Sequence, residues 1–381
     1  MYIKEITLEN WKNFKKPGKK SLKHRLFLVG PNAAGKSNLL DAFRFLRDLC
    51  VSGGGLEKAV SMRGGVSAIR CLAASHQPNI IIEIVIGGDG DDEWRYRLSF
   101  GQDNLRKPII KEEVAEHNGT ILLKRPDKED KKDSDRLRQT AIQQVNANKD
   151  FRDVATFLQS VSYQHLLPQV VRDPKGFSPG KVENDPFGRD LLQKVFNTPQ
   201  KIRDSRLRKI QVALAVAAPQ LRDLKMDRDN LGIPHLKGLY EHWRPNAGWQ
   251  DESQFSDGTL RLFGLLWSLL EGDGPLLMEE PELSLHSEVV RHLPQLIERV
   301  NKQRKVKRQV IISTHSEEML SDPGIGGEEI LRLEPSPGGT LIISPMDSPE
   351  DRALLESGLA VSEVVLPKSA PKKHDQLSLA F

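Results

Sequence analysis

Cysteine, long apolar runs and excess charge of one sign are all scarce in this chain of 381 residues. Its two cysteines, Cys50 and Cys71, cannot build a disulfide framework or a zinc site by themselves, which favours a cytoplasmic location. No run of about 18 apolar residues occurs, so we expect no transmembrane helix and no membrane partner. The opening MYIKEITLENWKNF lacks the apolar run of a signal peptide. A net charge of +4 leaves only local patches to attract nucleic acid.

What is present suits a globular protein. Hydrophobic residues make up 38% of the chain and charged residues 28%, which excludes a mainly disordered or collagen-like chain. At roughly 150 residues per domain, the length predicts two or three domains.

Alternating apolar residues predict strands, and apolar residues at helical spacing predict helices. The expected strands are 2–8, 25–29, 80–86, 94–100, two within 109–123, 160–164, two within 221–243, 275–279, 309–313 and a sheet element in 328–345. The expected helices are 37–49, two within 189–218, 259–270 and 284–300. The charged run 127–158 is expected to be helical with a solvated face.

The strongest motif matches G-x4-G-K-[ST] directly after a predicted strand and at the start of a predicted helix. It consists of Gly30, Pro31, Asn32, Ala33, Ala34, Gly35, Lys36 and Ser37. Backbone N–H groups of such a loop face an anion. Lys36 is expected to neutralise phosphate charge and the Ser37 hydroxyl to ligate Mg²⁺. The context disfavours a plain glycine turn, so the sequence predicts a nucleotide site.

Two carboxylates, Glu279 and Glu280, end the apolar strand of PLLMEEPELSLH. A buried strand end tolerates such charges poorly unless they have a task. In a phosphate-loop site, one carboxylate holds the Mg²⁺ shell and the next activates the attacking water.

Two further signals depend on these motifs for their meaning. His315 ends the buried-type strand of VIISTHSEE; alone it would be structural, but beside the two carboxylates it is expected to reach a γ-phosphate. Ser256, Asp257 and Gly258 open the apolar helix, and they form either an ordinary N-cap or a second anion-binding helix start.

The order of these motifs resembles the ATP-binding-cassette (ABC) ATPase heads, and specifically the RecF/SMC-like branch of DNA repair and anti-phage defence proteins. The opening IKEITLENWKNF before GPNAAGKSN, which ends at Asn38, is similar to that branch's N-terminal signature. The resemblance implies an α/β fold: a P-loop NTPase head with a mixed sheet, an antiparallel β subdomain and an inserted helical lobe. It implies ATP and Mg²⁺ as cofactors.

Carried over by residue, the resemblance makes residues 30–37 Walker A and residues 276–280 Walker B, with Glu279 at the metal and Glu280 as the catalytic base. Other roles follow in the same way: Ser256, Asp257 and Gly258 as the signature, residues 283–286 as the D-loop, His315 as the switch histidine, and Gln164 as the Q-loop glutamine at the nucleotide and Mg²⁺. Arg63 is either an arginine-loop residue or a plain surface arginine. Two departures are Glu279, where aspartate is commoner, and Asp257, where many transporters have glycine.

The resemblance also implies a homodimer, with higher oligomers left open, because the signature of one protomer caps the nucleotide held by the other. The expected parts are the N-terminal head 1–165, a helical and β lobe 166–255, the C-terminal head 256–345 and a flexible tail 346–381.

The work that the ATPase drives stays open between two functions. One is an ATPase that senses DNA and activates a separate nuclease or toxin effector in anti-phage defence; the other is a repair or replication accessory. About 65 residues follow His315, too few for a fused Toprim nuclease. DNA contact would fall on residues 201–209 or on Lys302, Arg304, Lys305, Lys307 and Arg308, unless these are only solvated faces.

The last six residues resemble the short motif that docks bacterial polymerases and repair proteins on the sliding clamp. They include Gln376, Leu377, Leu379 and Phe381 and follow the basic stretch LPKSAPKKHD. The alternative is an apolar terminus that folds back on its own sheet edge.

Overall fold

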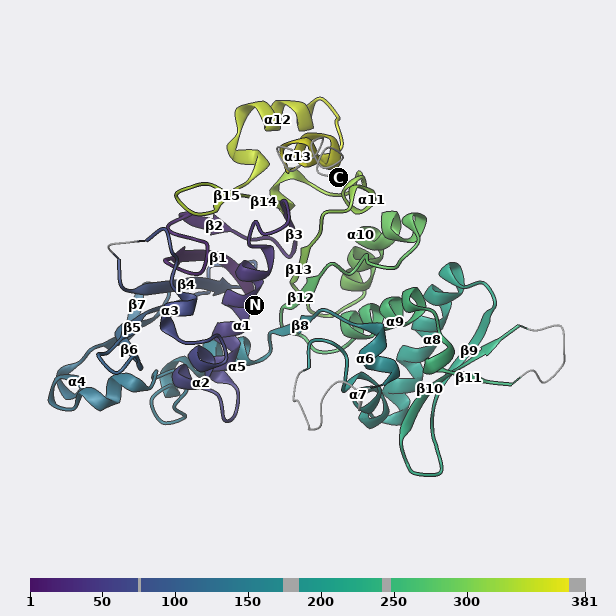
Figure 1. Cartoon of the computed structure of the whole chain (residues 1–381), viewed down its shortest axis with the longest axis horizontal. Coiled ribbons are helices and arrows are strands. Elements are labelled where there is room, and N and C mark those ends of the chain that lie inside the picture. The colour runs from purple at the N-terminus through teal and green to yellow at the C-terminus, as the bar shows by residue number, and fades with distance from the viewer. Residues whose placement is uncertain (75–76, 174–184, 242–247, 370–381) are drawn as a thin grey trace, which may run out of the picture.

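Three β-sheets organise the computed structural model, which describes residues 1–74, 77–173, 185–241 and 248–369. Two six-stranded sheets lie in the main body, and a three-stranded sheet lies in a lobe to one side (Figure 1). Among the described residues, no helix combines the length and the apolar character that a bilayer span needs.

The core sheet has the strand order β15-β14-β3-β13-β12-β8. Its strands are β3 (Arg25–Val29), β8 (Ser162–Gln164), β12 (Leu276–Glu279), β13 (Val310–Ser313), β14 (Ile330–Glu334) and β15 (Leu341–Ile343). Strands β14, β3, β13, β12 and β8 pair in parallel, whereas β15 pairs with β14 antiparallel. The carboxyl ends of the parallel strands therefore share one edge, where open α/β sheets bind ligands.

Both faces of the core sheet are apolar, as a buried parallel sheet requires. Leu28 and Leu277 point into one hydrophobic core together with α1 (Lys36–Cys50) and the N-terminal sheet. Phe27 and Met278 point into the other, which includes α9 (Asp257–Leu270). Each such side chain contributes about 1.5–3 kcal/mol by its burial. Helices α1 and α9 consequently lie on opposite sides of the core sheet (Figure 1).

An antiparallel sheet covers the N-terminal side, with the strand order β2-β1-β4-β5-β6-β7. Its strands are β1 (Tyr2–Glu9), β2 (Lys19–Ser21), β4 (Ile80–Gly87), β5 (Glu93–Gln102), β6 (Pro108–His117) and β7 (Thr120–Arg125). Asn118 and Gly119 connect β6 to β7 with φ of 47° and 79°, the left-handed pair that a tight hairpin needs. This is the hairpin that the sequence predicts there.

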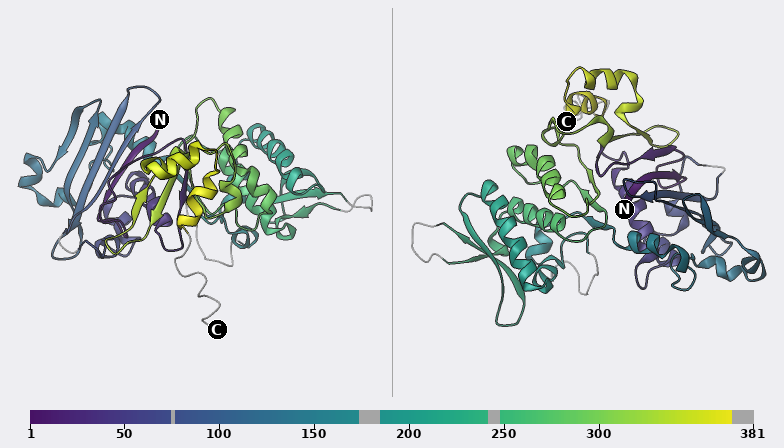
Figure 2. Two further views of the ribbon diagram at one scale, coloured as in Figure 1. Left: turned by 90° about the horizontal axis from the view of Figure 1, so that it is seen from above. Right: turned by 180° about the vertical axis from the view of Figure 1, so that it is seen from behind.

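The lobe on the other side combines helices with a small antiparallel sheet in the order β11-β10-β9 (Figure 2). Its elements are α6 (Pro168–Arg172), α7 (Leu191–Asn197), α8 (Gln200–Ala217), β9 (Leu221–Arg228), β10 (Pro234–Tyr240) and β11 (Gln250–Asp251). The remaining helices are α2 (Leu56–Ser61), α3 (Val66–Ile69), α4 (Lys128–Lys132), α5 (Arg152–Gln159), α10 (Ser287–Lys302), α11 (Glu317–Leu320), α12 (Pro349–Glu356) and α13 (Val361–Ser369). The expected mixed sheet with an antiparallel β subdomain is confirmed.

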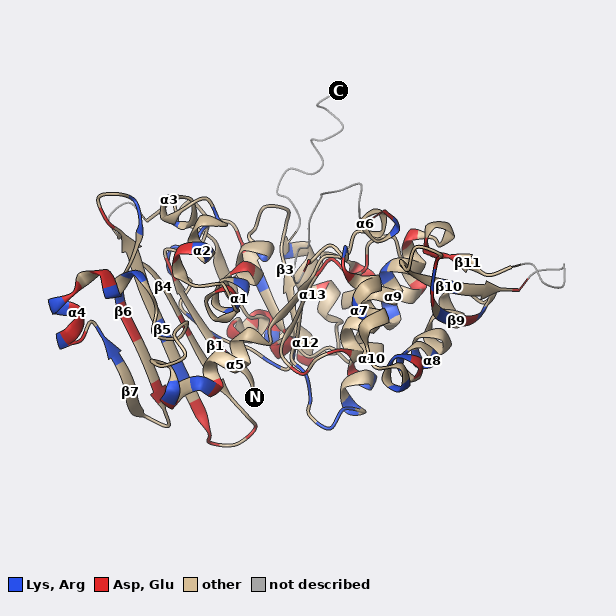
Figure 3. Cartoon of the chain, turned by 90° about the horizontal axis from the view of Figure 1, so that it is seen from below, with Lys and Arg blue, Asp and Glu red and all other residues tan. Residues whose placement is uncertain are grey.

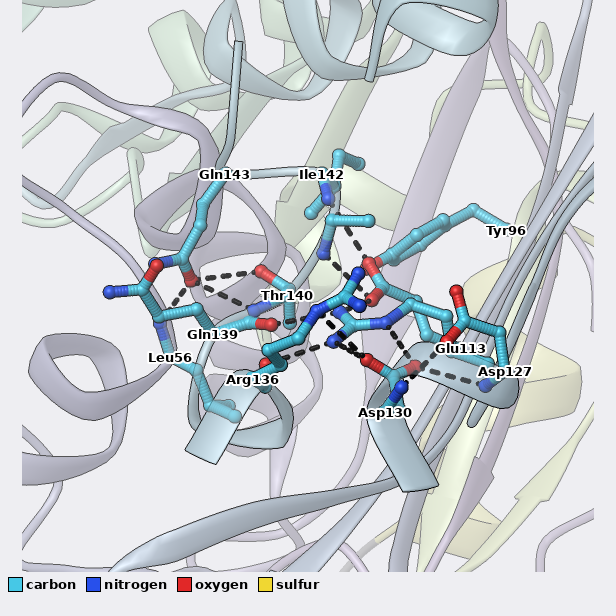
Figure 4. Close-up of polar contacts among 12 residues, drawn as sticks. Leu56, Tyr96, Glu113, Asp127, Asp130, Arg136, Gln139, Thr140, Ile142 and Gln143 are labelled. Atoms are coloured by element: carbon cyan, nitrogen blue, oxygen red, sulfur yellow. Dashed lines mark hydrogen bonds and ion pairs between the residues drawn. The ribbon is translucent and has the colours of Figure 1, made fainter. Parts of the chain in front are cut away.

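The charged run 127–158 is helical only in short pieces, and most of its charged side chains are exposed, as expected. It forms α4, α5 and short 3₁₀ turns, and within α4 the side chain of Asp130 is buried. Arg125 donates two hydrogen bonds of 2.9 Å to Asp130 and one of 3.2 Å to the buried Glu113 (Figure 4). Ion pairing makes the burial of Asp130 tolerable, so the run combines a solvated face with one buried network.

The expected flexible tail is wrong for residues 346–369, which fold as α12 and α13. Val361, Val364 and Val365 are spaced so that one face of α13 packs into the core beside α11 and β14. The clamp-like residues Gln376, Leu377, Leu379 and Phe381 lie outside the described residues.

Candidate active site

The phosphate loop connects β3 to α1. Two of its positions have room only for glycine. Gly35 has φ 99°, and a Cβ there would lie 2.0 Å from Nδ2 of Asn13. A Cβ on Gly30 would lie 2.6 Å from the carbonyl oxygen of Leu333. Ala33 also has a positive φ, 64°. Side chains at the two glycines would therefore break the loop.

Asn13 fixes this loop from outside, and sequence reasoning missed it. Its Nδ2 donates to the carbonyl of Ala34 at 2.8 Å and to Oγ1 of Thr340 at 2.7 Å. Its Oδ1 accepts from Nδ2 of Asn38 at 2.9 Å. One amide thus braces the loop, α1 and the segment before β15. The only signal for it was its place in WKNF, just after β1.

Lys36 is buried inside the loop that it follows. Its Nζ donates to the carbonyl of Gly30 at 2.7 Å and to that of Pro31 at 3.3 Å. Burial lowers the pKa of Lys36, and the nearby carboxylates of Glu280 and Glu279 oppose that shift. The ammonium group therefore places a positive charge inside the phosphate loop, and the nearby carboxylates compensate that charge only in part.

Glu279 ends β12, and both its carboxylate oxygens accept hydrogen bonds. Ser37 Oγ donates to one oxygen and the Tyr163 hydroxyl to the other. The Ser37 side chain is exposed, so this corner of the site opens to solvent. A serine hydroxyl beside a carboxylate is an oxygen donor set of the kind Mg²⁺ takes with a nucleotide.

Glu280 turns away from the strand line because its φ is 44°. Its N–H donates to the carbonyl of Ser313 at 3.0 Å, which holds this left-handed turn against β13. Its Oε1 lies 3.3 Å from Nδ1 of His315, and His315 is half exposed. Positive φ in a non-glycine residue is a strained state that surrounding structure must maintain, as at many functional sites. The strain here aims Glu280 at His315.

A third carboxylate, that of Glu282, lies buried beside Glu280 and His315. Sequence reasoning missed it too. Thr314 Oγ1 donates to Oε1 of Glu282 at 2.6 Å, and both residues are buried. Burial raises the pKa of Glu282, although the bond from Thr314 opposes the shift. This contact joins the segment after Glu280 to the segment that carries His315.

The signature residues form a second group on the far side of the core sheet. Ser256 Oγ caps α9 by accepting from the N–H of Thr259 at 3.1 Å. Asp257 pairs with Arg172 at 2.6 Å, and a Cβ on Gly258 would lie 2.7 Å from the carbonyl of Ser284. Within the described part of the chain, no hydrogen bond or ion pair connects the signature to the phosphate loop.

Gln164 and Arg63 do not join the cluster in this structure. The Gln164 amide nitrogen faces α9, 3.3 Å from where a Cβ on Gly264 would lie, and no hydrogen bond among the described residues links Gln164 to Glu279. Arg63 is no surface arginine: its side chain is buried and pairs with Asp41 at 2.8 Å and Asp48 at 3.0 Å.

Two of the expected DNA-contacting arginines serve the fold instead. Arg308 is 2% exposed and donates to the carbonyls of Glu271 and Gly274 at 2.5 and 2.6 Å, just after α9. Burial lowers its pKa to about 10. Arg304 donates to the carbonyl of Leu269 at 2.9 Å. These carbonyls lie at and after the negative end of α9, so the two cations stabilise that end of the helix.

A protein-family model described as "AAA domain, putative AbiEii toxin, Type IV TA system" matches residues 26–321, from β3 through the segment that carries His315. The chain belongs to this family. The AAA domain thus includes the phosphate loop, both glutamates and the signature helix. Among curated protein sequences, none matches the chain.

Solved structures of SMC heads share the fold of this AAA domain. An Smc head bound to the C-winged helix domain of ScpA is 15% identical with a TM-score of 0.56, over 90% of this chain and 97% of that one. An Smc head with an extended coiled coil, bound to the C-terminal domain of ScpA derived from Pyrococcus furiosus, is 13% identical with a TM-score of 0.54, over 93% and 99%. The expected resemblance to SMC-like ABC ATPase heads is confirmed.

Proposed function

We propose that the chain binds ATP with Mg²⁺ and hydrolyses it. The observation that carries this proposal is the meeting of Lys36, Ser37, Glu279, Glu280 and His315 at the carboxyl edge of the core sheet. Three parallel strands, β3, β13 and β12, deliver these residues to one place. Family membership and the fold support the same reading.

The residues present fit both cofactors. The loop 30–37 offers backbone N–H groups at a helix N-terminus, and Lys36 adds a buried cation. Ser37 and Glu279 would hold Mg²⁺, with Asn38 and Gln164 as further family positions near the nucleotide. When bound, the metal neutralises phosphate charge as a Lewis acid.

The chain's own acid–base chemistry centres on Glu280. The backbone N–H of Glu280 is held by the Ser313 carbonyl, and the Glu280 carboxylate would accept a proton from the attacking water. His315 Nδ1, at 3.3 Å, would help to orient this carboxylate, and the same ring would offer a donor where negative charge develops.

The separation of signature and phosphate loop supports a homodimer. Ser256 is exposed and the first residues of α9 are half-buried, and among the described residues no hydrogen bond or ion pair links this helix N-terminus to the phosphate loop of the same chain. In the proposed dimer, this group would cap the nucleotide of the second protomer.

The decisive experiment uses Glu280→Gln, which keeps the side chain's shape and removes the base. We expect ATP hydrolysis to fall by at least about 100-fold while ATP binding persists. Size-exclusion chromatography with light scattering should then show an ATP-dependent dimer. The matched control is Glu288→Gln on the exposed start of α10, which should hydrolyse ATP normally. An unchanged hydrolysis rate in Glu280→Gln would overturn the assignment.

For the biological role, we propose that the ATPase acts on or senses DNA in the cytoplasm and activates a separate effector chain. The family description names a putative toxin of a toxin–antitoxin system, and the similar Smc heads bind a partner, ScpA. The exposed Lys302 ends α10 and the exposed Lys305 and Lys307 follow it, and Lys201, Arg208 and Lys209 lie exposed on α8 (Figure 3). The alternative is a repair accessory that docks on the sliding clamp through Gln376, Leu377, Leu379 and Phe381. Capture of Glu280→Gln with ATP from native cells separates the two: an effector chain supports the first, and the clamp with DNA supports the second.

A further inference from the structure

Tyr163 reaches the metal corner of the active site from a strand that carries none of the ATPase motifs except the expected Q-loop glutamine. Strand β8 pairs in parallel with β12, with Tyr163 opposite Leu277 and Gln164 opposite Met278. This register leaves Tyr163 two positions short of Glu279. The phenol is long enough to cover that gap, and its hydroxyl donates to the Glu279 carboxylate.

A cation packs against the ring face of Tyr163 and helps to hold it in place. The Arg44 guanidinium lies 4.2 Å from the ring centroid, and Arg44 in turn is 3.7 Å from the carboxylate of Asp41. Such a cation over an aromatic face contributes about 0.5–2 kcal/mol. An ordinary phenol is protonated at neutral pH, so the Tyr163 hydroxyl is a donor to Glu279.

The carboxylate that Tyr163 contacts is the one that departs from the family pattern. Glutamate is one methylene longer than the commoner aspartate and has one more rotatable bond, so it needs more to hold it in place. Here Ser37 fixes one of its oxygens and Tyr163 the other. When Ser37 turns to a metal ion, Tyr163 remains as a second anchor.

We propose that Tyr163 is a positioning residue for the metal site, and that its hydroxyl supplies the constraint that lets Glu279 stand where aspartate is usual. This inference rests on the proposed Mg²⁺-ATP function. Partners that orient a metal-associated ligand typically change metal affinity by about 10–100-fold when removed.

The test is Tyr163→Phe, which removes one oxygen and keeps the ring against Arg44. Calorimetry with a non-hydrolysable ATP analogue would measure nucleotide binding in EDTA and across a Mg²⁺ series. We expect the Mg²⁺ concentration for half-maximal binding enhancement to rise about tenfold, with binding in EDTA unchanged. In the Glu279→Asp background, Tyr163→Phe should cause no further rise, because the two residues act as one unit.

Tyr96→Phe is the matched control, because the Tyr96 hydroxyl also donates to a glutamate, the buried Glu113 at 3.0 Å, away from the phosphate loop. It should leave the Mg²⁺ series unchanged. A Tyr163→Phe protein that folds and shows the wild-type Mg²⁺ series overturns this inference alone. A wild-type protein that binds no nucleotide at any Mg²⁺ concentration overturns the proposed function as well.

Discussion

The hydroxyl of Ser37 donates a hydrogen bond to the carboxylate of Glu279, which lies 242 residues further along the chain. The contact joins the N-terminus of α1 to the end of β12 across β13, the strand between β3 and β12. It brings together the two oxygen groups that the proposed Mg²⁺ site would use. The order of the core strands therefore places residues that are far apart in the sequence at one corner of the sheet.

Lys36→Ala should abolish stabilisation by nucleotide. At a ligand concentration near 100 times Kd, Mg²⁺-ATP should raise the free energy of unfolding of the wild type by about 2.7 kcal/mol. The variant loses the buried cation and should show no such shift in a thermal melt. The exposed Lys58→Ala serves as control and should behave as the wild type. Equal shifts in all three proteins would contradict the site.

His315→Ala should slow hydrolysis and spare binding. The ring lies 3.3 Å from Glu280 and is half exposed, so its loss removes a donor without opening the core. We expect kcat to fall about 100-fold, with nucleotide affinity within about threefold of wild type. Steady-state kinetics and calorimetry would check both. A loss of affinity with normal kcat would show that His315 binds and does not assist the chemistry.

Ser256→Asp, made in the Glu280→Gln background, should prevent the ATP-dependent dimer. Aspartate is as good an N-cap as serine, so α9 should keep its start, but the new charge would face the partner's phosphate. We expect the dimer Kd to rise at least about tenfold, measured by sedimentation. Ser253→Asp, also exposed and three residues earlier, is the control. Dimers of equal strength in both variants would argue against capping by the signature.

Glu113→Ala should destabilise the fold strongly. Glu113 is fully buried and accepts from the N–H groups of Ala141 and Ile142 at 2.7 and 3.1 Å as well as from Arg125. Its removal leaves the buried guanidinium of Arg125 only partly compensated. We expect the free energy of unfolding, measured in urea, to fall by about 3–5 kcal/mol. Glu112→Ala next to it removes an exposed ion pair with Arg97 and should cost less than about 1 kcal/mol.

Asp130→Asn should make the free energy of unfolding depend less on pH below about pH 4. The hydrogen bonds from Arg125 lower the pKa of Asp130 to about 2, against burial that opposes the shift. A depressed carboxyl pKa stabilises the fold above about pH 4 and loses that contribution as pH falls toward 2, an amount of about 2 kcal/mol. The wild-type advantage over Asp130→Asn, measured by urea unfolding, should therefore shrink across that range. A constant difference would contradict the shift.

Local motifs explain why much of the fold and site could be predicted. The phosphate loop is specified by adjacent residues such as Gly35 and Lys36, and the carboxylates Glu279 and Glu280 follow directly on an apolar strand. Tyr163 and Asn13 escaped prediction because their partners lie elsewhere in the sequence. Tyr163 meets Glu279 only through the β8–β12 register, and single-sequence patterns do not encode strand neighbours.

Residue charge and position in the chain gave wrong predictions of exposure in other places. Asp130 and Arg308 read as surface residues by type, yet each is buried, because partners across the fold compensate its charge. The segment 346–369 reads as a tail by its place after the last motif, but Val361, Val364 and Val365 of α13 pack into the same core as α9 and β12. Burial depends on partners, which residue type alone does not reveal.

Strand β3 has its two sheet neighbours, β13 and β14, at residues 310–334, so it emerges from a ribosome about 280 residues before either of them exists. At about 5–20 residues per second, that interval lasts roughly 15–55 s. During it, the apolar residues of β3 must be shielded by the nascent N-terminal sheet or by a chaperone. The phosphate loop therefore gains its backing in the core sheet only after residues 310–334 have been made.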